Sequence, residues 1–271
     1  MKKTWLPLVP ALLLTFFALS GCSDSAAPDA AKAGAPQATP ATKTLVIGLD
    51  DNFPPMGFVD ENGVLVGFDI DMAREAAHRM GREAVFRPID WSAKEAELMS
   101  KRLDLLWNGL TITPARQQKI GFSRPYMENH QIIVVASGSP VKGKADLARK
   151  IVGVQDGSSA EDAIARDAAT AQSFQELRRY PDNVKALLDL HLGRIDAVVL
   201  DEVVGRYYVA KKPADYQVLE TDNFGVEEYG VGLRKEDEAL RAKLDATLDA
   251  MKADGATDAI AYRWFGKAIA Q

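Results

Sequence analysis

Short apolar runs alternate with helical segments along most of this chain, and the alternation restricts the folds available to it. Residues 44–49 (TLVIGL) and 83–89 (EAVFRPI) are typical of strands. Between them, residues 69–80 place Ala and Met side chains on one helical face, and Gly81 follows as a stop signal. Strands that alternate with helices predict an α/β sheet with crossover connections.

The alternation continues with a third strand at residues 103–109 (LDLLWNG) and then starts again. Residues 131–137 are extended, residues 150–169 have the pattern of strand, turn and helix, and residues 183–209 that of helix, strand and helix. Two such units predict two lobes. In open α/β sheets ligands bind outside the carboxyl ends of the strands, so a site is expected at those ends.

Polar or small residues follow four of the predicted strands. They occupy residues 50–53, residues 108–116, residues 155–159 and Asp201. A free α-amino acid is one solute that such a set could hold. Its carboxylate is matched by a guanidinium, and its ammonium carries three donors that need a carboxylate and other acceptors.

The stretch WNGLTITPAR, residues 107–116, contains the guanidinium. A helix N-cap at Thr113 and a first helical residue at Pro114 account for two of its residues. Arg116 then falls at about the third helical position, where free N–H groups and the helix dipole also favour an anion.

Three further residues suit a zwitterion. Gly109 allows close approach of the backbone. Thr111 offers a hydroxyl that can face either charged group of the ligand, and Asp201 supplies a negative partner for the ammonium.

The N-terminal residues predict export. Lys2 and Lys3 precede an apolar run at residues 6–19, which predicts a signal peptide over residues 1–21. Cys22, after LSG, resembles the lipidated cysteine of a bacterial lipobox; the alternative is an ordinary signal peptide with an incidental cysteine. It is the only cysteine of the chain, so an intrachain disulfide is excluded.

Residues 22–43 contain no large apolar side chain and predict a flexible tether. The net charge of −5 and the lack of a Lys/Arg-rich run argue against nucleic acid or an anionic membrane surface as the partner. We therefore expect a monomer in the periplasm or at the cell surface, held to a membrane by lipid alone. Whether that is the inner or the outer membrane stays open.

Six segments, in this order, resemble the bacterial extracytoplasmic solute-binding proteins of the polar amino-acid type, family 3. The resemblance spans Thr44 to Phe265 and implies a periplasmic-binding-protein-like (type II) fold, in which two α/β lobes joined by two hinge strands close over an L-amino acid. It also implies delivery of that amino acid to the permease of an ABC transporter, with no cofactor. The segments are DDNFPPMGF, GVLVGFDIDMA, DLLWNGLTITPARQQKIGFSRPY, GVQDGSSAEDA, IDAVVLDE and YRWFG.

The resemblance also implies boundaries. The hinges would lie near residues 126–130 and 227–231. Lobe 1 would then comprise residues 44–127 plus 230–271, and lobe 2 residues 128–229.

Carried over to this sequence, the family pattern gives Arg116 the ligand carboxylate, with help from Thr111 and from the backbone N–H groups of Thr111 and Ser159. Asp201 would hold the ammonium, together with the Thr111 hydroxyl and the carbonyl of Asn108 or Gly109. Ser158 opens the same helix as Ser159 and shares its free N–H groups.

The side chain of the ligand would lie between Phe53 and Trp91, with Asp50 at its polar end. Asn108 and Gln155 depart from the best-known members of the family and suit an amide. Asp50 and the two aromatic rings suit a cation. We favour arginine, lysine or histidine over glutamine.

Structural roles compete with several of these assignments. Asp50 and Asp201 could cap a turn or a helix, and Trp91 could belong to the core. Ser159 lies at capping-box spacing from Asp162, which predicts that Ser158 or Ser159 caps the helix.

A rival function is a cyclohexadienyl or arogenate dehydratase, since such enzymes resemble this family. They use a carboxylic acid near the start of the second-lobe helix, where Glu161 lies. A first-turn Glu favoured by the helix dipole is much commoner, and Asp201 points to an ammonium that prephenate lacks. We expect no enzyme and no catalytic residue. We also expect no metal site, because the sequence has no HExxH and no CxxC motif.

Overall fold

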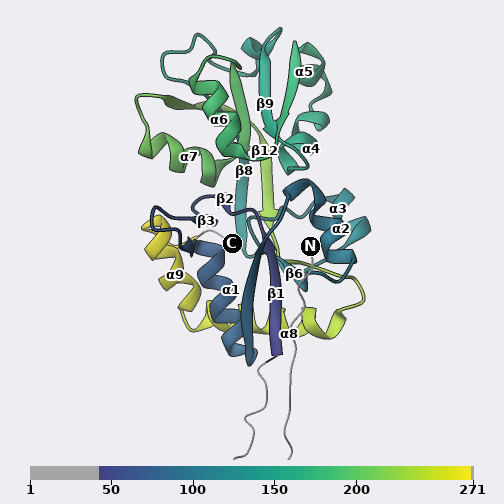
Figure 1. The fold of residues 1–271 in the computed structure, drawn as a ribbon. Coiled ribbons are helices and arrows are strands. Elements are labelled where there is room, and N and C mark those ends of the chain that lie inside the picture. Colours follow the sequence, from purple (N-terminus) through teal and green to yellow (C-terminus); the bar gives the residue numbers. More distant parts are fainter. Residues whose placement is uncertain (1–42, 270–271) are drawn as a thin grey trace, which may run out of the picture. The chain divides into compact units, whose positions relative to one another are not determined.

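Residues 43–269, which the computed structural model describes, form two α/β lobes joined by two strands (Figure 1). The sheet of the first lobe has the order β5–β1–β6–β13–β7. Its strands are β1 (Lys43–Leu49), β5 (Arg82–Pro88), β6 (Leu105–Leu106), β7 (Gly121–Phe122) and β13 (Gly232–Leu233).

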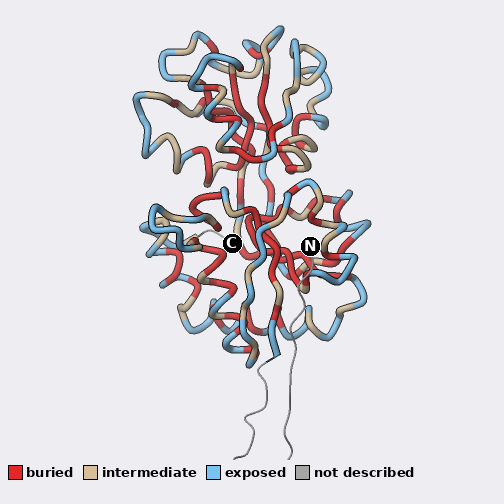
Figure 2. The backbone as a smooth tube through the Cα atoms, in the orientation of Figure 1, coloured by how far each residue is buried: buried red, intermediate tan, exposed pale blue. Residues whose placement is uncertain are grey.

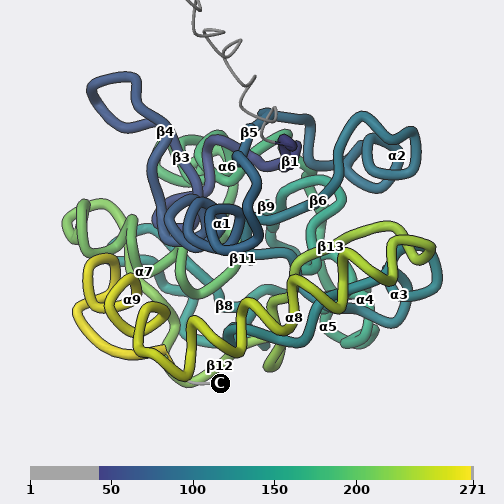
Figure 3. Tube along the Cα trace, turned by 90° about the horizontal axis from the view of Figure 1, so that it is seen from below, coloured from purple at the N-terminus to yellow at the C-terminus, as the bar shows by residue number. Residues whose placement is uncertain are grey.

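Helices and a small antiparallel sheet complete the first lobe. Figure 3 shows α1, α8 and α9, which contact one another beside the main sheet. The small sheet is formed by the chain segment that follows β1. The elements are α1 (Phe68–Arg79), the 3-10 helix η1 (Trp91–Ala93), α2 (Lys94–Met99), α3 (Pro114–Lys119), α8 (Glu238–Ala253), α9 (Ala256–Phe265), β2 (Asn52–Phe53), β3 (Gly57–Val59) and β4 (Leu65–Val66).

The second lobe has a sheet of the order β10–β9–β11–β8–β12. Its strands are β8 (Met127–Ala136), β9 (Ile151–Gln155), β10 (Glu176–Tyr180), β11 (Ala197–Asp201) and β12 (Tyr216–Tyr229). Its helices are the 3-10 helix η2 (Lys144–Leu147), α4 (Ser159–Arg166), α5 (Ala168–Ser173), α6 (Asn183–His191) and α7 (Glu202–Lys211).

Burial explains why these runs form strands. Leu45, Ile47 and Leu49 of β1 are fully buried, and all five residues of β11 are buried. Figure 2 shows buried residues along the strands of both sheets and exposed residues on the outer loops. Strands covered on both faces need nearly continuous apolar sequence, which is the pattern that predicted them.

Strands β8 and β12 connect the lobes, and they pair with each other, antiparallel, where they pass from one lobe to the other. Met127 lies opposite Tyr229, and Asn129 opposite Glu227. These residues fall in the two segments predicted as hinges, so the predicted pair of α/β lobes joined by two strands is confirmed. The lobe boundaries themselves stay a prediction.

The helix predicted over residues 69–80 agrees with α1 to within one residue. The helix predicted within residues 150–169 ends at Arg166, and a separate helix, α5, follows it. The third strand is shorter than predicted. Only Leu105 and Leu106 pair as β6. The N–H of Trp107 still donates to the Gly48 carbonyl at 3.1 Å. The chain then leaves the sheet, since Gly109 has a φ of 56°, in the left-handed region.

None of the helices within residues 43–269 combines the length and the apolar character that crossing a membrane requires. The predicted signal peptide, the tether and Cys22 lie outside the described residues.

Candidate functional site

The residues predicted to bind a ligand come together where the lobes meet. Several hydrogen bonds cross from lobe to lobe, among them Thr111 Oγ1 to Ser159 Oγ at 2.9 Å, Arg116 Nη2 to the Gly157 carbonyl at 3.1 Å, and Gln155 Nε2 to Asp50 Oδ2 at 2.7 Å. All eleven predicted residues are buried. They are Asp50, Phe53, Trp91, Asn108, Gly109, Thr111, Arg116, Gln155, Ser158, Ser159 and Asp201.

Arg116 is positioned by the local sequence as predicted. Pro114 opens α3, and the Thr113 hydroxyl accepts from the Arg116 N–H at 3.2 Å, which fixes the first helical turn. The guanidinium donates from Nη1 to the Thr111 carbonyl at 2.9 Å, and Nη2 donates to the Gly157 carbonyl. Its closest carboxylate, that of Glu95, lies 3.9 Å from Nε.

The hydrogen-bond partners of the Arg116 guanidinium among the described residues are therefore neutral carbonyls. Burial lowers the pKa of its guanidinium, but an arginine stays charged in proteins. A buried cation that makes no hydrogen bond to a carboxylate of the described residues, and whose closest one is 3.9 Å away, favours the approach of an anion.

Lys94 is a second buried cation beside Arg116, and sequence reasoning missed it. Its Nζ donates to the carbonyls of Trp91 at 3.1 Å and Gly157 at 2.8 Å. The pKa of Lys94 is lowered to about 8, first by burial and then by the charge of Arg116. A lysine in the helical run WSAKEAELM carries no signal for burial, because long charged side chains usually face water.

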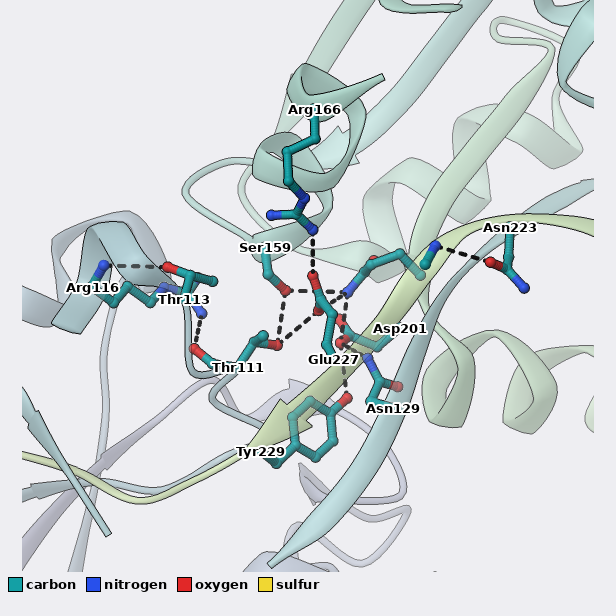
Figure 4. A network of polar contacts seen from close by, with 12 residues as sticks. Thr111, Thr113, Arg116, Asn129, Ser159, Arg166, Asp201, Asn223, Glu227 and Tyr229 are labelled. Atoms are coloured by element: carbon teal, nitrogen blue, oxygen red, sulfur yellow. Dashed lines mark hydrogen bonds and ion pairs between the residues drawn. The ribbon is translucent and has the colours of Figure 1, made fainter. Parts of the chain in front are cut away.

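Asp201 ends β11 and faces the same junction (Figure 4). Its Oδ1 accepts from Asn129 at 2.7 Å, from Gln131 at 3.0 Å and from the Tyr229 hydroxyl at 2.8 Å. No hydrogen bond from residues 43–269 ends on its Oδ2. The side chain does not cap α7, so the capping alternative is wrong.

The environment of Asp201 favours its neutral form. Its pKa is raised to about 7, chiefly by burial and then by the neighbouring carboxylate of Glu227, against the hydrogen bond from Tyr229. A cation bound beside Asp201 would reverse this balance and favour the ionised form.

Glu227 on β12 is a second carboxylate of the junction that sequence reasoning missed. Its Oε2 accepts from Thr111 Oγ1 at 3.0 Å and from Gln131 Nε2 at 2.9 Å. The available signal was strand alternation, which places Glu227 and Tyr229 on one face and the exposed Glu228 on the other.

Acceptors outnumber donors in this part of the junction. The Nε2 group of Gln131 has two hydrogens and faces three acceptors, on Ser159, Asp201 and Glu227. The side-chain oxygens of Gln131 and Asn129 are buried and accept no hydrogen bond from the described part of the chain. Unsatisfied buried acceptors are costly, so the set suits a group with several donors.

The serines at the start of α4 do not cap it, which corrects the prediction. No side chain caps this helix. The hydroxyl of Ser159 is engaged with Thr111 and Gln131 instead, and that of Ser158 is buried with no partner among the described residues. Tertiary contacts to the other lobe replace the local cap.

Asp50 lies at the other end of the predicted set. Its Oδ1 accepts from the Asn52 N–H at 2.9 Å, so it does stabilise a turn, and its Oδ2 accepts from Gln155. Burial raises the pKa of Asp50 above its usual value. Gln155 in turn accepts from Asn183 at 3.0 Å.

The aromatic residues Phe53 and Trp91 line the junction between the lobes, and they also pack against residues of the first lobe. A Cβ on Gly109 would lie 2.8 Å from the Phe53 ring, so Phe53 requires a glycine there. Trp91 belongs to a buried apolar cluster with Leu98 and Leu103, and Lys94 Nζ lies 5.1 Å from the centre of its ring. The core alternative for Trp91 is therefore correct in part.

Asn108 uses its side chain within the first lobe. With its amide turned by 180°, it donates to the Asp50 carbonyl at 3.0 Å and accepts from the Gly57 N–H at 3.2 Å. The side chain thus joins the two loops that follow β1 and β6.

Two other predicted features can be placed. Glu161, the candidate acid of the rival enzyme, lies on α4 and pairs with Nε of Arg179 on β10 at 2.7 Å. Burial is the main cause that raises the pKa of Glu161. Within residues 43–269, no three His, Cys, Asp or Glu side chains are grouped so that they could hold a metal ion.

Known proteins resemble this chain over most of its length. The family model of the bacterial extracellular solute-binding proteins, family 3, matches residues 45–267. The L-cystine-binding protein TcyJ of Escherichia coli strain K12 is 33% identical over 225 residues, which are 82% of this chain and 83% of that protein.

Solved structures are similar in both fold and sequence. A substrate-binding protein of an ABC uptake transporter from Streptococcus pneumoniae, with bound histidine, gives a TM-score of 0.78 at 34% identity over 84% of this chain and 94% of that chain. An ancestral arginine-binding protein bound to glutamine gives 0.77 at 39% identity over 83% and 98%. The predicted type II periplasmic-binding fold is confirmed.

Proposed function

Because the chain belongs to the bacterial extracellular solute-binding proteins, family 3, we propose that it binds a polar L-amino acid between its lobes and delivers it to an ABC importer. The observation that carries the proposal is a buried guanidinium from one lobe beside an acceptor-rich group from the other. Arg116 and Asp201 are each only 5% exposed. The names of the relatives, which bind cystine, histidine or arginine, support the same class of ligand.

Arg116 holds the carboxylate of the amino acid. Two of its five N–H donors are engaged by the carbonyls of Thr111 and Gly157, which leaves donors for a carboxylate. The backbone N–H groups of Thr111 and of Ser159, the first residue of α4, assist it.

Asp201 holds the ammonium. Its Oδ1 is fixed by three donors, so its Oδ2 is oriented for the ligand. The carbonyl of Asn108 or Gly109 and the Thr111 hydroxyl complete the group of acceptors. A cation with three donors suits this surplus of acceptors better than a neutral group does.

Phe53 and Trp91 flank the ligand side chain, and Asp50, Gln155 and Asn108 lie at its polar end. Asp50 and the two rings favour arginine, lysine or histidine over glutamine. The two lobes, residues 44–127 plus 230–271 and residues 128–229, move about the paired hinge strands. Ligand favours the closed form because it contacts both lobes only there.

We infer transport rather than catalysis. The carboxylate of Glu161 is engaged by Arg179, and the buried carboxylate of Asp201 suits an ammonium, which prephenate lacks. Incubation with prephenate or arogenate is expected to yield no phenylpyruvate or phenylalanine, and formation of either product would overturn this inference.

The protein acts as a monomer tethered by a lipid on Cys22. The sequence around Cys22 supports this, and the test is a Cys22→Ser variant of the full chain. The variant is expected in the soluble extracytoplasmic fraction while the parent stays with membranes. An unchanged distribution would refute the anchor.

A thermal-shift screen tests the binding function. The twenty standard L-amino acids, cystine and ornithine are added separately, because a ligand of the native state raises the melting temperature. We expect at least one basic amino acid or glutamine to do so, with calorimetry confirming one site. If none of these compounds shifts the melting temperature, the proposed function is wrong.

A further inference from the structure

Glu227 is a buried carboxylate in the hinge that the binding scheme above does not use. Its side chain is 3% exposed. It comes from β12, whereas its partner Thr111 comes from the loop of the first lobe that precedes α3. Its other side-chain partners are Gln131, at 2.9 Å, and Arg166, which is 3.5 Å away and half exposed.

Glu227 fixes the direction of the Thr111 hydroxyl. A carboxylate can only accept, so the Thr111 hydroxyl gives its single proton to Glu227 Oε2 at 3.0 Å. Toward Ser159, at 2.9 Å, Thr111 must then accept. Ser159 in turn accepts from Gln131 Nε2 at 3.1 Å, which gives a chain of bonds running from Gln131 to Glu227.

Further acceptors lie beside this chain of hydrogen bonds. Asp201 and Glu227 both accept from the Gln131 amide nitrogen. Arg116 is committed to two carbonyls, and Arg166 reaches only the outer oxygen of Glu227. Toward the ligand, Thr111 therefore presents only lone pairs.

We propose that Glu227 makes the site selective for ligands that carry an α-ammonium, by holding the Thr111 hydroxyl so that it only accepts from the ligand. An ammonium can donate to Asp201 and Thr111 at once. The α-hydroxyl of the matching 2-hydroxy acid has one proton, so it leaves one of these acceptors unsatisfied. Glu227 is thus a positioning residue for specificity, and the inference rests on the proposed function.

The test compares two pairs of compounds, L-arginine with argininic acid and L-histidine with imidazolelactic acid. Affinities are measured by calorimetry for the parent and for Glu227→Gln, with the pair whose amino acid binds more tightly. A glutamine can donate to Thr111 and free its proton for the ligand. We expect the preference for the amino acid to fall by about tenfold or more, the size of one charge-assisted hydrogen bond.

Glu228→Gln is the matched control, because Glu228 is the next residue of the same strand and is exposed. It is expected to keep the parent's preference. A parent that binds neither of these amino acids, nor any other compound of the thermal-shift screen, overturns the proposed function. A parent that binds, with a Glu227→Gln variant whose preference changes less than twofold, overturns the role of Glu227 alone.

Thr111→Val separates specificity from a general loss of structure. If Glu227 acts through Thr111, the valine lowers the preference by itself, and adding Glu227→Gln changes it little further. Independent effects of the two substitutions would contradict the proposal. Should Glu227→Gln fail to fold, Thr111→Val alone is decisive, since an unchanged preference in that variant refutes the role of the hydroxyl.

Discussion

The guanidinium of Arg116 donates to the main-chain carbonyl of Gly157 at 3.1 Å, so a side chain of the first lobe is bonded to the turn before α4 in the second. Lys94 donates to the same oxygen at 2.8 Å. One carbonyl therefore meets two buried cations, and the turn at Gly157 is a point of close approach between the lobes.

This closeness predicts the effect of Gly157→Ala. An added Cβ would lie 3.0 Å from Ser92 Cα, across the lobe junction. Gly193 has the same φ of 67° and no neighbour within 4 Å, which makes Gly193→Ala the matched control. Each substitution is expected to cost about 1–2 kcal/mol of folding stability from the left-handed conformation.

Only Gly157→Ala is expected to weaken ligand binding in calorimetry, because only its methyl group opposes closure. Equal affinities of the two alanine variants, at comparable stability in urea, would show that the lobes do not approach through this turn.

Replacing Arg116 is expected to remove most of the affinity. Arg116→Ala should cost about 2–5 kcal/mol of binding free energy, the range for breaking a buried charge pair. Arg116→Lys should recover only part of it, because a lysine cannot bind a carboxylate through two parallel hydrogen bonds. Arg241, which is exposed on α8, provides the control Arg241→Lys. Parent-like affinity of Arg116→Ala would contradict the assignment.

Ligand affinity is expected to depend on pH through Asp201. Its pKa is about 7, and an ammonium binds the ionised form. Protons therefore compete with the ligand below pH 7, and the affinity should fall about thirtyfold from pH 8 to pH 5.5. Asp201→Asn should bind weakly with little pH dependence. A parent affinity that is constant over this range would show that Asp201 does not hold the ammonium.

Asp69 should make folding stability fall as the pH rises. This fully buried carboxyl accepts from the Gly109 N–H at 2.6 Å and the Tyr126 hydroxyl at 2.9 Å. Burial raises its pKa from 3.8 to about 7. Between these values the folded state binds the proton more tightly than the unfolded state does, so the free energy of unfolding decreases as the pH rises toward 7 and then levels off.

Urea titrations between pH 4 and pH 8 measure this effect. Asp69→Asn should flatten the decrease, whereas Glu61→Gln, at an exposed position, should leave it unchanged. An identical pH profile for Asp69→Asn and the parent would be the contrary result.

Local chemistry made part of the site predictable. Thr113 and Pro114 fix the start of α3, so the place of Arg116 follows from sequence alone. Asp201 follows an apolar run, and the carboxyl ends of strands are where sites form in α/β sheets. The alternation of strands and helices is also a local pattern, so the two lobes could be predicted from sequence.

What the sequence did not predict depends on contacts between distant segments. Glu227 lies beside Thr111 because β8 and β12 pair in one register, with Asn129 opposite Glu227. Ser159 was expected to cap α4, but the other lobe competes for its hydroxyl. Lys94 is buried because Gly157 of the second lobe accepts its hydrogen bond, which no local pattern encodes.

A crystal structure with the amino acid that binds most tightly tests the central claim most directly. The carboxylate of the ligand is predicted on the guanidinium of Arg116 and its ammonium on Oδ2 of Asp201, with Thr111 Oγ1 accepting from the ammonium. A ligand bound in the reverse orientation, or one that contacts neither Arg116 nor Asp201, would contradict it.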